Sequence, residues 1–216
     1  MKGALAVFVK TPELSPVKTR LAASLGKAAA VAVYAECLGL SADMMRELPA
    51  DVKPFWAVGE LAGLKSKRWG EFPVIFTGEG TLGDRLNLVY STLQKQYGRV
   101  ALAGSDCPQL KSTAVSCALQ QAHGKTIIGP ADDGGFYLFA AARRITKKTW
   151  TTVKYSQDDT LTQLLRRLDG GRTVFLPPLS DVDDIRSLKA ALKLMQKDSS
   201  PQQRQSAIRL KNKLWG

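Results

Sequence analysis

Hydrophobic residues in this chain gather into short runs, and the segments between the runs have the apolar spacing of helices. Each run is bounded by glycine, proline or polar residues, which is typical of a buried strand. Strands that alternate with helices predict an α/β fold in three layers, with a mostly parallel sheet between two layers of helices. The runs lie at residues 4–9, 54–58, 73–76, 100–104, 126–129, 136–141 and 173–177.

Two of the helical segments carry further signals. Residues 17–48 are rich in Ala and Leu, lack proline and contain glycine only at Gly26 and Gly39, so they predict one long helix or two shorter ones. From Leu82 to Tyr97 apolar residues recur at helical spacing, and Gly98 follows as a stop signal. We therefore expect one helix that ends just before Gly98.

A polar stretch with a proline, SSPQQ at residues 199–203, separates residues 188–197 from a last helical segment. We therefore expect one main domain over residues 1–198 and a basic, helical appendage over residues 199–216. A chain of 216 residues with 44% hydrophobic content can bury the core of such a domain.

Half of the formal charge of +12 lies near the C-terminus. From residue 189 to the end, seven Lys or Arg stand against a single Asp, which gives +6. Such a run occurs in segments that bind nucleic acid or anionic lipid, but more often in solvated basic helices. Because the body of the chain lacks interleaved basic and aromatic residues, specific nucleic-acid binding is not expected.

The cysteines and histidine exclude several classes of site. Cys37, Cys107 and Cys117 have no paired spacing, which favours reduced thiols over a disulfide framework. His123 is the single histidine, so a histidine-rich zinc site is excluded and a Ser-His-Asp hydrolase is disfavoured. Cys107, beside the acidic motif, could be a nucleophile, but no local sequence signature supplies the base that would activate it.

The amino terminus has too short an apolar run for a secretory signal. No stretch approaches the roughly 20 apolar residues that span a bilayer. We therefore expect a cytoplasmic protein with no transmembrane segment.

Two predicted strands run into glycine and acid, in GSDCPQL after residues 100–104 and in GPADDGGFYLF around Asp132 and Asp133. Because ligands of open α/β sheets bind beyond the carboxyl ends of the strands, these acids and Asp106 are expected at a ligand site. Carboxylates without histidine or cysteine suit Mg²⁺ or Mn²⁺, which suits a diphosphate. There are structural alternatives to a ligand site. Asp106 could be a turn or cap residue, and the Asp-Gly pair could form a hairpin turn.

Basic residues follow the first predicted strand in VKTPELSPVKTRL, with Lys10, Lys18 and Arg20 near a helix start. Cations beside free backbone N–H groups make a phosphate site, although a solvated basic loop has the same composition. The spacing matches neither a P-loop nor GxGxxG.

A third acidic group follows the last strand in LPPLSDVDDIRSL. Asp181, Asp183 and Asp184 could add a metal ligand or cap the helix that begins near Ile185. We expect capping from Asp184 and leave Asp183 open.

The ordered motifs VKTRL, LGDRL, GSDCPQL, GPADDGGFYL and PPLSDVDDIRSL resemble the bacterial family DUF2064, placed among GT-A-type nucleotide-diphospho-sugar transferases. The resemblance spans about residues 1–188. It implies a Rossmann-like α/β/α sandwich of the GT-A type, with a nucleotide at the carboxyl ends of the first strands and a divalent metal on its phosphates. The opening motif and the DGG turn also resemble guanylyltransferases that activate phospholactate or phosphoenolpyruvate.

The resemblance implies roles residue by residue. Asp106 and Asp133 would be catalytic, and with Asp183 they would hold the metal, Mg²⁺ or Mn²⁺. The nucleotide and its phosphates would be bound by Lys10, Lys18, Thr19, Arg20, Gly83, Asp84, Arg85, Gly134 and Gly135.

The chain also departs from the family pattern. Asp184 stands for a threonine and Ser187 for an acid, and the opening loop reads ELSP where relatives often have glycine. Tyr155 and Ser156 resemble a Trp-Ser pair that would lie on the acceptor side.

The leading hypothesis is a metal-dependent enzyme that transfers the sugar of a nucleotide-sugar to an unknown small-molecule acceptor. The alternative is a nucleotidyltransferase that joins a nucleoside triphosphate to a small phosphorylated substrate and releases pyrophosphate. A degenerate domain that only binds nucleotide is the third hypothesis.

Overall fold

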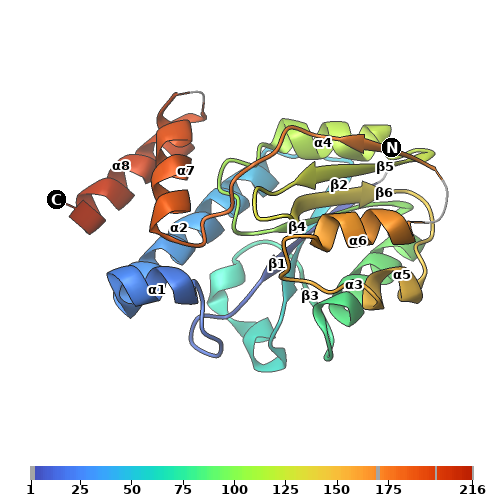
Figure 1. Cartoon of the computed structure of the whole chain (residues 1–216), viewed down its shortest axis with the longest axis horizontal. Coiled ribbons are helices and arrows are strands. Elements are labelled where there is room, and N and C mark those ends of the chain that lie inside the picture. Colours follow the sequence, from blue (N-terminus) through green and yellow to red (C-terminus); the bar gives the residue numbers. More distant parts are fainter. Residues whose placement is uncertain (1–2, 169–170, 198, 216) are drawn as a thin grey trace.

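The computed structural model describes residues 3–168, 171–197 and 199–215, and its centre is one sheet with helices on both faces (Figure 1). The strands are β1 (Gly3–Val9), β2 (Val52–Val58), β3 (Val74–Phe76), β4 (Arg99–Gly104), β5 (Lys125–Pro130), β6 (Phe136–Ala141) and β7 (Arg172–Phe175). The α-helices are α1 (Thr19–Leu25), α2 (Lys27–Arg46), α3 (Leu82–Tyr97), α4 (Ser112–Gln121), α5 (Lys147–Thr151), α6 (Thr160–Arg167), α7 (Ile185–Lys197) and α8 (Pro201–Trp215). Two short 3₁₀ turns, η1 (Leu61–Lys65) and η2 (Lys67–Trp69), follow β2.

Every apolar run that predicted a strand overlaps one, and α3 spans the predicted residues. The segment 17–48 forms two helices because the chain breaks at Gly26, whose φ of 84° and ψ of 159° suit only glycine. The Asp-Gly turn is a hairpin, since β5 and β6 pair antiparallel with a register shift at Gly129/Pro130. The prediction of two shorter helices in residues 17–48 and the prediction of a hairpin at the Asp-Gly turn are confirmed.

The strand order is β3-β2-β1-β4-β6-β5-β7. Among the described strands, β6 alone runs against the others, so the sheet is mixed and mostly parallel, as the sequence predicted. The chain proceeds from β1 to β2 on one side and returns to place β4 on the other. Open α/β sheets bind ligands beyond the carboxyl ends of the strands at such a reversal of strand order, which here lies between β1 and β4.

Helices cover the two faces of the sheet with separate cores. On one face α2 and α4 pack on the sheet through residues such as Leu38, Met45 and Leu119. On the other face α3, α5 and α6 pack around Tyr90 and Trp150. The α/β/α sandwich is therefore confirmed.

A third core joins α1 and α2 to α7 and α8, at the end of the molecule away from β6 and β7 (Figure 1). Ala207 and Leu210 of α8 are buried there. Arg209 pairs with Glu36 of α2 at 2.8 Å, and Gln203 Nε2 donates to Pro108 O at 2.8 Å. The segment predicted as an appendage thus packs against α2 and against the loop after β4.

Helix α2 qualifies the expectation about apolar stretches. By length and composition it meets the criteria for a membrane span, with a mean hydropathy of 1.3. Half of that stretch is buried inside the protein, which is the property of a core helix.

Gly83 in α3 lies against the backbone of α5, and the packing of the two helices depends on its lack of a side chain. A Cβ there would stand 2.5 Å from Trp150 O and 3.0 Å from Thr151 Cα. We expect Gly83→Ala to lower the free energy of unfolding by about 1–3 kcal/mol, as overpacking does.

The matched control is Gly39→Ala in α2, where an added Cβ meets nothing within 4 Å. This change should raise stability by about 0.5–1 kcal/mol, because alanine favours the helix. Urea unfolding of both variants measures the difference, and similar effects at the two positions would refute the packing role of Gly83.

Candidate functional site

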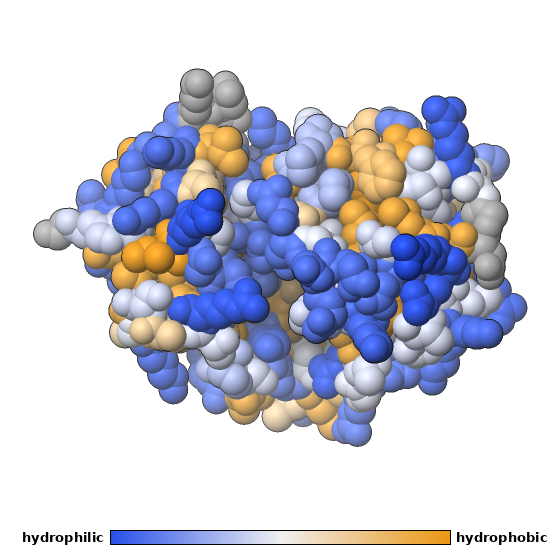
Figure 2. Space-filling view, viewed as in Figure 1, coloured by the Kyte–Doolittle hydropathy of each residue, from blue (hydrophilic) through white to orange (hydrophobic). Residues whose placement is uncertain are grey.

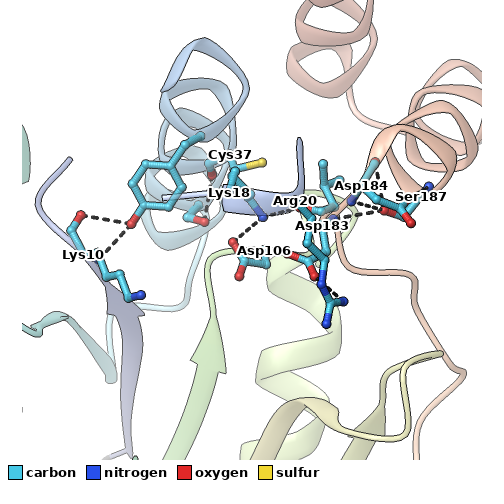
Figure 3. A network of polar contacts seen from close by, with 11 residues as sticks. Lys10, Lys18, Arg20, Cys37, Asp106, Asp183, Asp184 and Ser187 are labelled. Carbon is cyan, nitrogen blue, oxygen red and sulfur yellow. Dashed lines mark hydrogen bonds and ion pairs between the residues drawn. The ribbon is translucent and has the colours of Figure 1, made fainter. Parts of the chain in front are cut away.

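An ion pair between a buried lysine and a half-exposed aspartate lies at the carboxyl edge of the sheet, where the loops after β1 and β4 meet. The Lys18 side chain is 2% exposed and its Nζ donates to Asp106 Oδ1 at 2.5 Å. The same ammonium also donates to Val182 O. Figure 3 shows Lys18 directed at Asp106, while Arg20 turns toward Asp183.

Lys18 has an unusual backbone conformation for its residue type. Its φ of 49° and ψ of 48° are left-handed, and it stands immediately before α1. A non-glycine residue in this region is strained and persists where its surroundings determine it. The interactions of its ammonium group with two distant segments provide such surroundings.

The ion pair keeps Lys18 charged in spite of its burial. Desolvation alone would lower the pKa of the ammonium, but the Asp106 charge and hydrogen bond outweigh it, so the pKa lies above its ordinary value. The Asp106 side chain is 51% exposed, and no described residue donates to its Oδ2. Asp106 is therefore anchored by one oxygen and open to a ligand at the other.

The segment after β7 completes the site. Val182 N donates to Asp106 O at 2.8 Å, and Leu179 forms an isolated parallel bridge with Ala131. Asp183 pairs with Arg20 at 2.9 Å. These contacts bring the third acidic motif to the edge of the sheet.

Asp184 caps α7, as the sequence predicted. Its Oδ1 accepts from Ser187 N at 2.7 Å, and Ser187 Oγ accepts from Asp184 N at 3.0 Å. These hydrogen bonds hold the pKa of Asp184 below its ordinary value. Ser187, at the position where the resemblance implies an acid, thus completes the cap.

Two adjoining cavities open at this edge. The larger, which we name the cationic cavity, has a volume of about 850 Å³ and is lined by Lys10, Lys18, Arg20 and Arg85. The smaller, which we name the acidic cavity, has about 270 Å³ and is lined by Asp106, Asp133 and Asp181 among apolar residues. Figure 2 shows this face hollowed near its centre, with mostly hydrophilic residues at the rim.

Asp106 and Ser156 line both cavities. Ser156 also has a positive φ of 60°, so both left-handed non-glycine residues among the described ones, Lys18 and Ser156, line the cationic cavity. Strained residues concentrate at functional sites, which supports a functional role for this junction.

The structure brings most of the predicted site residues to these cavities. Lys10, Lys18, Thr19, Arg20, Arg85 and Asp183 line the cationic cavity with Asp106, while Asp133 and Gly135 line the acidic one. Which of them bind a ligand stays a prediction.

Three predicted residues line neither cavity and make contacts within the protein. Gly83 packs on Trp150, and Asp84 completes the capping box of α3 with Thr81. Gly134 has a φ of 84°, and a Cβ there would stand 1.8 Å from Asp158 O, so the position requires glycine for the turn.

Tyr34 is a site residue that sequence reasoning missed. Its Oη accepts from Lys10 N at 2.8 Å and donates to Lys10 O at 3.0 Å, which fixes the start of the basic loop. It lies within the helical pattern of α2 like any core residue, so no local signal separates it. Glu60, which accepts from Thr11 N at 2.8 Å, fixes the same loop.

The carboxylates repel one another. Burial, followed by the charges of Asp133, Asp183 and Asp106, raises the pKa of Asp181 to about 6. No three His, Cys, Asp or Glu side chains among the described residues form a ready metal site. Mg²⁺, however, usually takes one or two carboxylates and completes its shell with water and substrate phosphate. Asp106, which lines both cavities, together with either Asp133 or Asp183, supplies the one or two carboxylates of that pattern.

The cysteines behave as the sequence predicted. All three are free thiols. Burial, together with Asp181 and Asp106, raises the pKa of Cys107 well above its ordinary value. Because the thiolate is the nucleophilic form, Cys107 is disfavoured as a catalytic group.

The unequal burial of Lys18 and Asp106 generates a prediction about stability. Asp106→Asn leaves a buried ammonium without its countercharge and should lower the free energy of unfolding by about 1–3 kcal/mol. Lys18→Met leaves Asp106 open to water and should cost less. Urea unfolding measures the free energy of unfolding of the two variants. The control is Asp43→Asn, which removes an exposed ion pair with Arg46 and should leave the free energy of unfolding within about 0.5 kcal/mol of wild type. A larger loss for Lys18→Met would contradict this account of the pair.

Several solved structures are similar to this chain. In solved structures, the chain is similar to a candidate nucleotide-diphospho-sugar transferase of Desulfovibrio desulfuricans G20, at 25% identity over 99% of this chain and 97% of that one, with a TM-score of 0.81. It shares the fold of the Rv0371c protein of Mycobacterium tuberculosis H37Rv solved with manganese (14% identity, 89% and 97% covered, TM-score 0.54). It also shares the fold of a CMP:2-keto-3-deoxy-manno-octonic acid synthetase complexed with CTP (14% identity, 92% and 100% covered, TM-score 0.50).

No curated protein matches the sequence. The model of the family described as an uncharacterized protein conserved in bacteria, DUF2064, matches residues 42–157, which is more than half of the chain. The chain therefore belongs to the DUF2064 family.

Proposed function

We propose that the protein is a metal-dependent transferase that holds a nucleotide-sugar in the cationic cavity and transfers the sugar to an acceptor in the acidic cavity. The observation that carries the proposal is the junction of the two cavities at Asp106. A diphosphate that lies against the cations would place its sugar at the opening of the second cavity. The likeness to a candidate nucleotide-diphospho-sugar transferase supports this choice.

The cationic side has the groups that a diphosphate needs. Lys10 and Arg20 are exposed, and Arg85 Nη1 is positioned by a bond to Gly59 O at 2.9 Å. Charge-assisted hydrogen bonds from such groups are stronger than neutral ones. Lys18 acts differently, because its ammonium is already engaged with Asp106 and Val182 O and fixes the carboxylate in place.

Asp106, together with Asp133 or Asp183, would hold Mg²⁺ or Mn²⁺. A divalent ion bound there would neutralise charge on the leaving diphosphate. In the transfer, the acceptor oxygen forms a bond to the anomeric carbon, and the bond from that carbon to the diphosphate oxygen breaks. The electron pair leaves with the nucleoside diphosphate, and the acceptor proton passes to a carboxylate or to water.

Nucleotidyl transfer is the second candidate, favoured by the shared fold of a synthetase complexed with CTP. Here a substrate phosphate oxygen would bond to the α-phosphorus, the α–β bridging bond would break, and pyrophosphate would leave with the electron pair. The same cations and metal would hold the triphosphate. A cytoplasmic location, the lack of specific nucleic-acid binding and the division at residue 198 stay predictions.

Product analysis separates these functions. The protein with Mn²⁺ is given a panel of nucleotide-sugars with a mixture of acceptors and, separately, nucleoside triphosphates with phospholactate. We expect nucleoside diphosphate from a nucleotide-sugar. Pyrophosphate from a triphosphate would overturn the sugar-transfer proposal, and metal-independent nucleotide binding without any product would indicate a binding protein.

Removal of a cation should weaken nucleotide binding. We expect Arg20→Gln to raise the Kd of a nucleoside diphosphate with Mg²⁺ by roughly tenfold, since a charge-assisted contact is worth about 1.5–3 kcal/mol. Titration calorimetry measures the change. The matched control is Lys53→Gln. Lys53 is an exposed cation at the start of β2, at the amino ends of the strands, and its removal should leave the Kd unchanged. Equal effects of the two variants would contradict a local phosphate site.

A further inference from the structure

The acidic cavity has a composition that selects its ligand. Its walls include the rings of Phe8, Phe136, Tyr137 and Tyr155. The hydroxyls of both tyrosines are engaged elsewhere, since Tyr137 Oη donates to Pro177 O at 2.9 Å and Tyr155 Oη to Trp150 O at 3.0 Å. The tyrosines therefore offer the cavity ring surface and no free donor.

Among the described lining residues, the charged groups of the cavity are all carboxylates. Asp106, Asp133 and Asp181 line it, and no Lys, Arg or His is among the described residues that do. Asp106 is offset by Lys18, whereas Asp133 and Asp181 form no ion pair within the described parts of the chain. A single divalent ion would only balance these two charges.

The two cavities therefore divide the charges. Four cationic side chains, together with Glu60 and Asp183, lie on one side of Asp106, whereas the charged side chains on the other side are carboxylates alone. Asp183 faces the first side and Asp181 the second, with Val182 O between them bound to Lys18. Lys18 lies at this boundary but does not line the acidic cavity, so its ammonium is not available to pair with a ligand there.

We propose that the acidic cavity binds a second substrate that has an apolar ring, carries a hydroxyl or protonated amine, and has no anionic group. The ring would pack on the aromatic walls, and the hydroxyl or ammonium would donate to the carboxylates. A phosphate or carboxylate would meet Asp133 and Asp181, and no cationic side chain among the described lining residues could pair with it. The inference rests on the proposed function, and it disfavours the phosphorylated substrate of the nucleotidyltransferase alternative.

A charge series on one ring tests the proposal. The probes are tyramine, 2-(4-hydroxyphenyl)ethanol and 4-hydroxyphenylacetate, which are cationic, neutral and anionic. Their binding to the full chain loaded with Mg²⁺ and a nucleoside diphosphate is measured by ligand-observed NMR. We expect the cation and the neutral probe to bind at least about tenfold more tightly than the anion.

Neutral variants identify the carboxylates that cause the difference. Asp133→Asn and Asp181→Asn should each reduce severalfold the ratio of the Kd of the anionic probe to the Kd of the cationic probe. Asp43 is an exposed aspartate of α2 that pairs with Arg46, and Asp43→Asn should leave this ratio unchanged. A thermal unfolding curve confirms that each variant is folded. The proposal is overturned if the anion binds as tightly as the other probes, or if none of the three binds at millimolar concentration.

Transfer assays distinguish this inference from the proposed function. Sugar transfer to a phosphorylated or carboxylated acceptor would overturn the inference and leave sugar transfer standing. The expected order of probe affinities without release of nucleoside diphosphate from any nucleotide-sugar would support the inference and overturn the proposed function.

Discussion

The buried contact between Lys18 and Asp106 is the interaction on which the site depends. It joins three segments that are distant in sequence: the start of α1, the loop after β4 and the segment before α7. Each of these follows a strand of the sheet, so the contact sets how the loops meet at the carboxyl edge. Because the ammonium is buried and the carboxylate half exposed, the pair fixes one oxygen of Asp106 and leaves the other for a ligand. The strained backbone of Lys18 is the cost of this arrangement.

The same contact separates two chemical environments. Exposed cations of the basic loop, with Arg85 of α3, line a large cavity suited to phosphates, while aromatic rings and carboxylates line a smaller one. A transferase needs both of its substrates to meet at one reacting bond, and the two cavities meet at Asp106. The fold is shared with a candidate nucleotide-diphospho-sugar transferase and with a synthetase complexed with CTP, so the fold does not determine the reaction. In our proposal, the charges of the acidic cavity favour sugar transfer over nucleotidyl transfer to a phosphorylated substrate.

Most of the fold is predictable from local patterns, whereas the roles of several site residues are not. Apolar runs and helix signals are properties of neighbouring residues, which is why β6 and α3 have the predicted bounds. Lys18 looks like a loop cation in sequence, and only the chain reversal at β1 and β4 brings a carboxylate to it. Gly83 fits a ligand motif, but its constraint is the backbone of Trp150 in another helix. Asp181 and Asp183 lie two positions apart in one acidic motif, yet they line different cavities because of the path of one short segment.

A crystal structure of the protein with Mn²⁺ and a nucleoside diphosphate would test the central claim most directly, because anomalous scattering locates manganese. We expect the manganese peak against the exposed oxygen of Asp106, with the diphosphate between it and the cations Lys10, Arg20 and Arg85. The Lys18 contact should remain intact in that complex. A diphosphate in the acidic cavity, or manganese bound away from Asp106, would contradict the account.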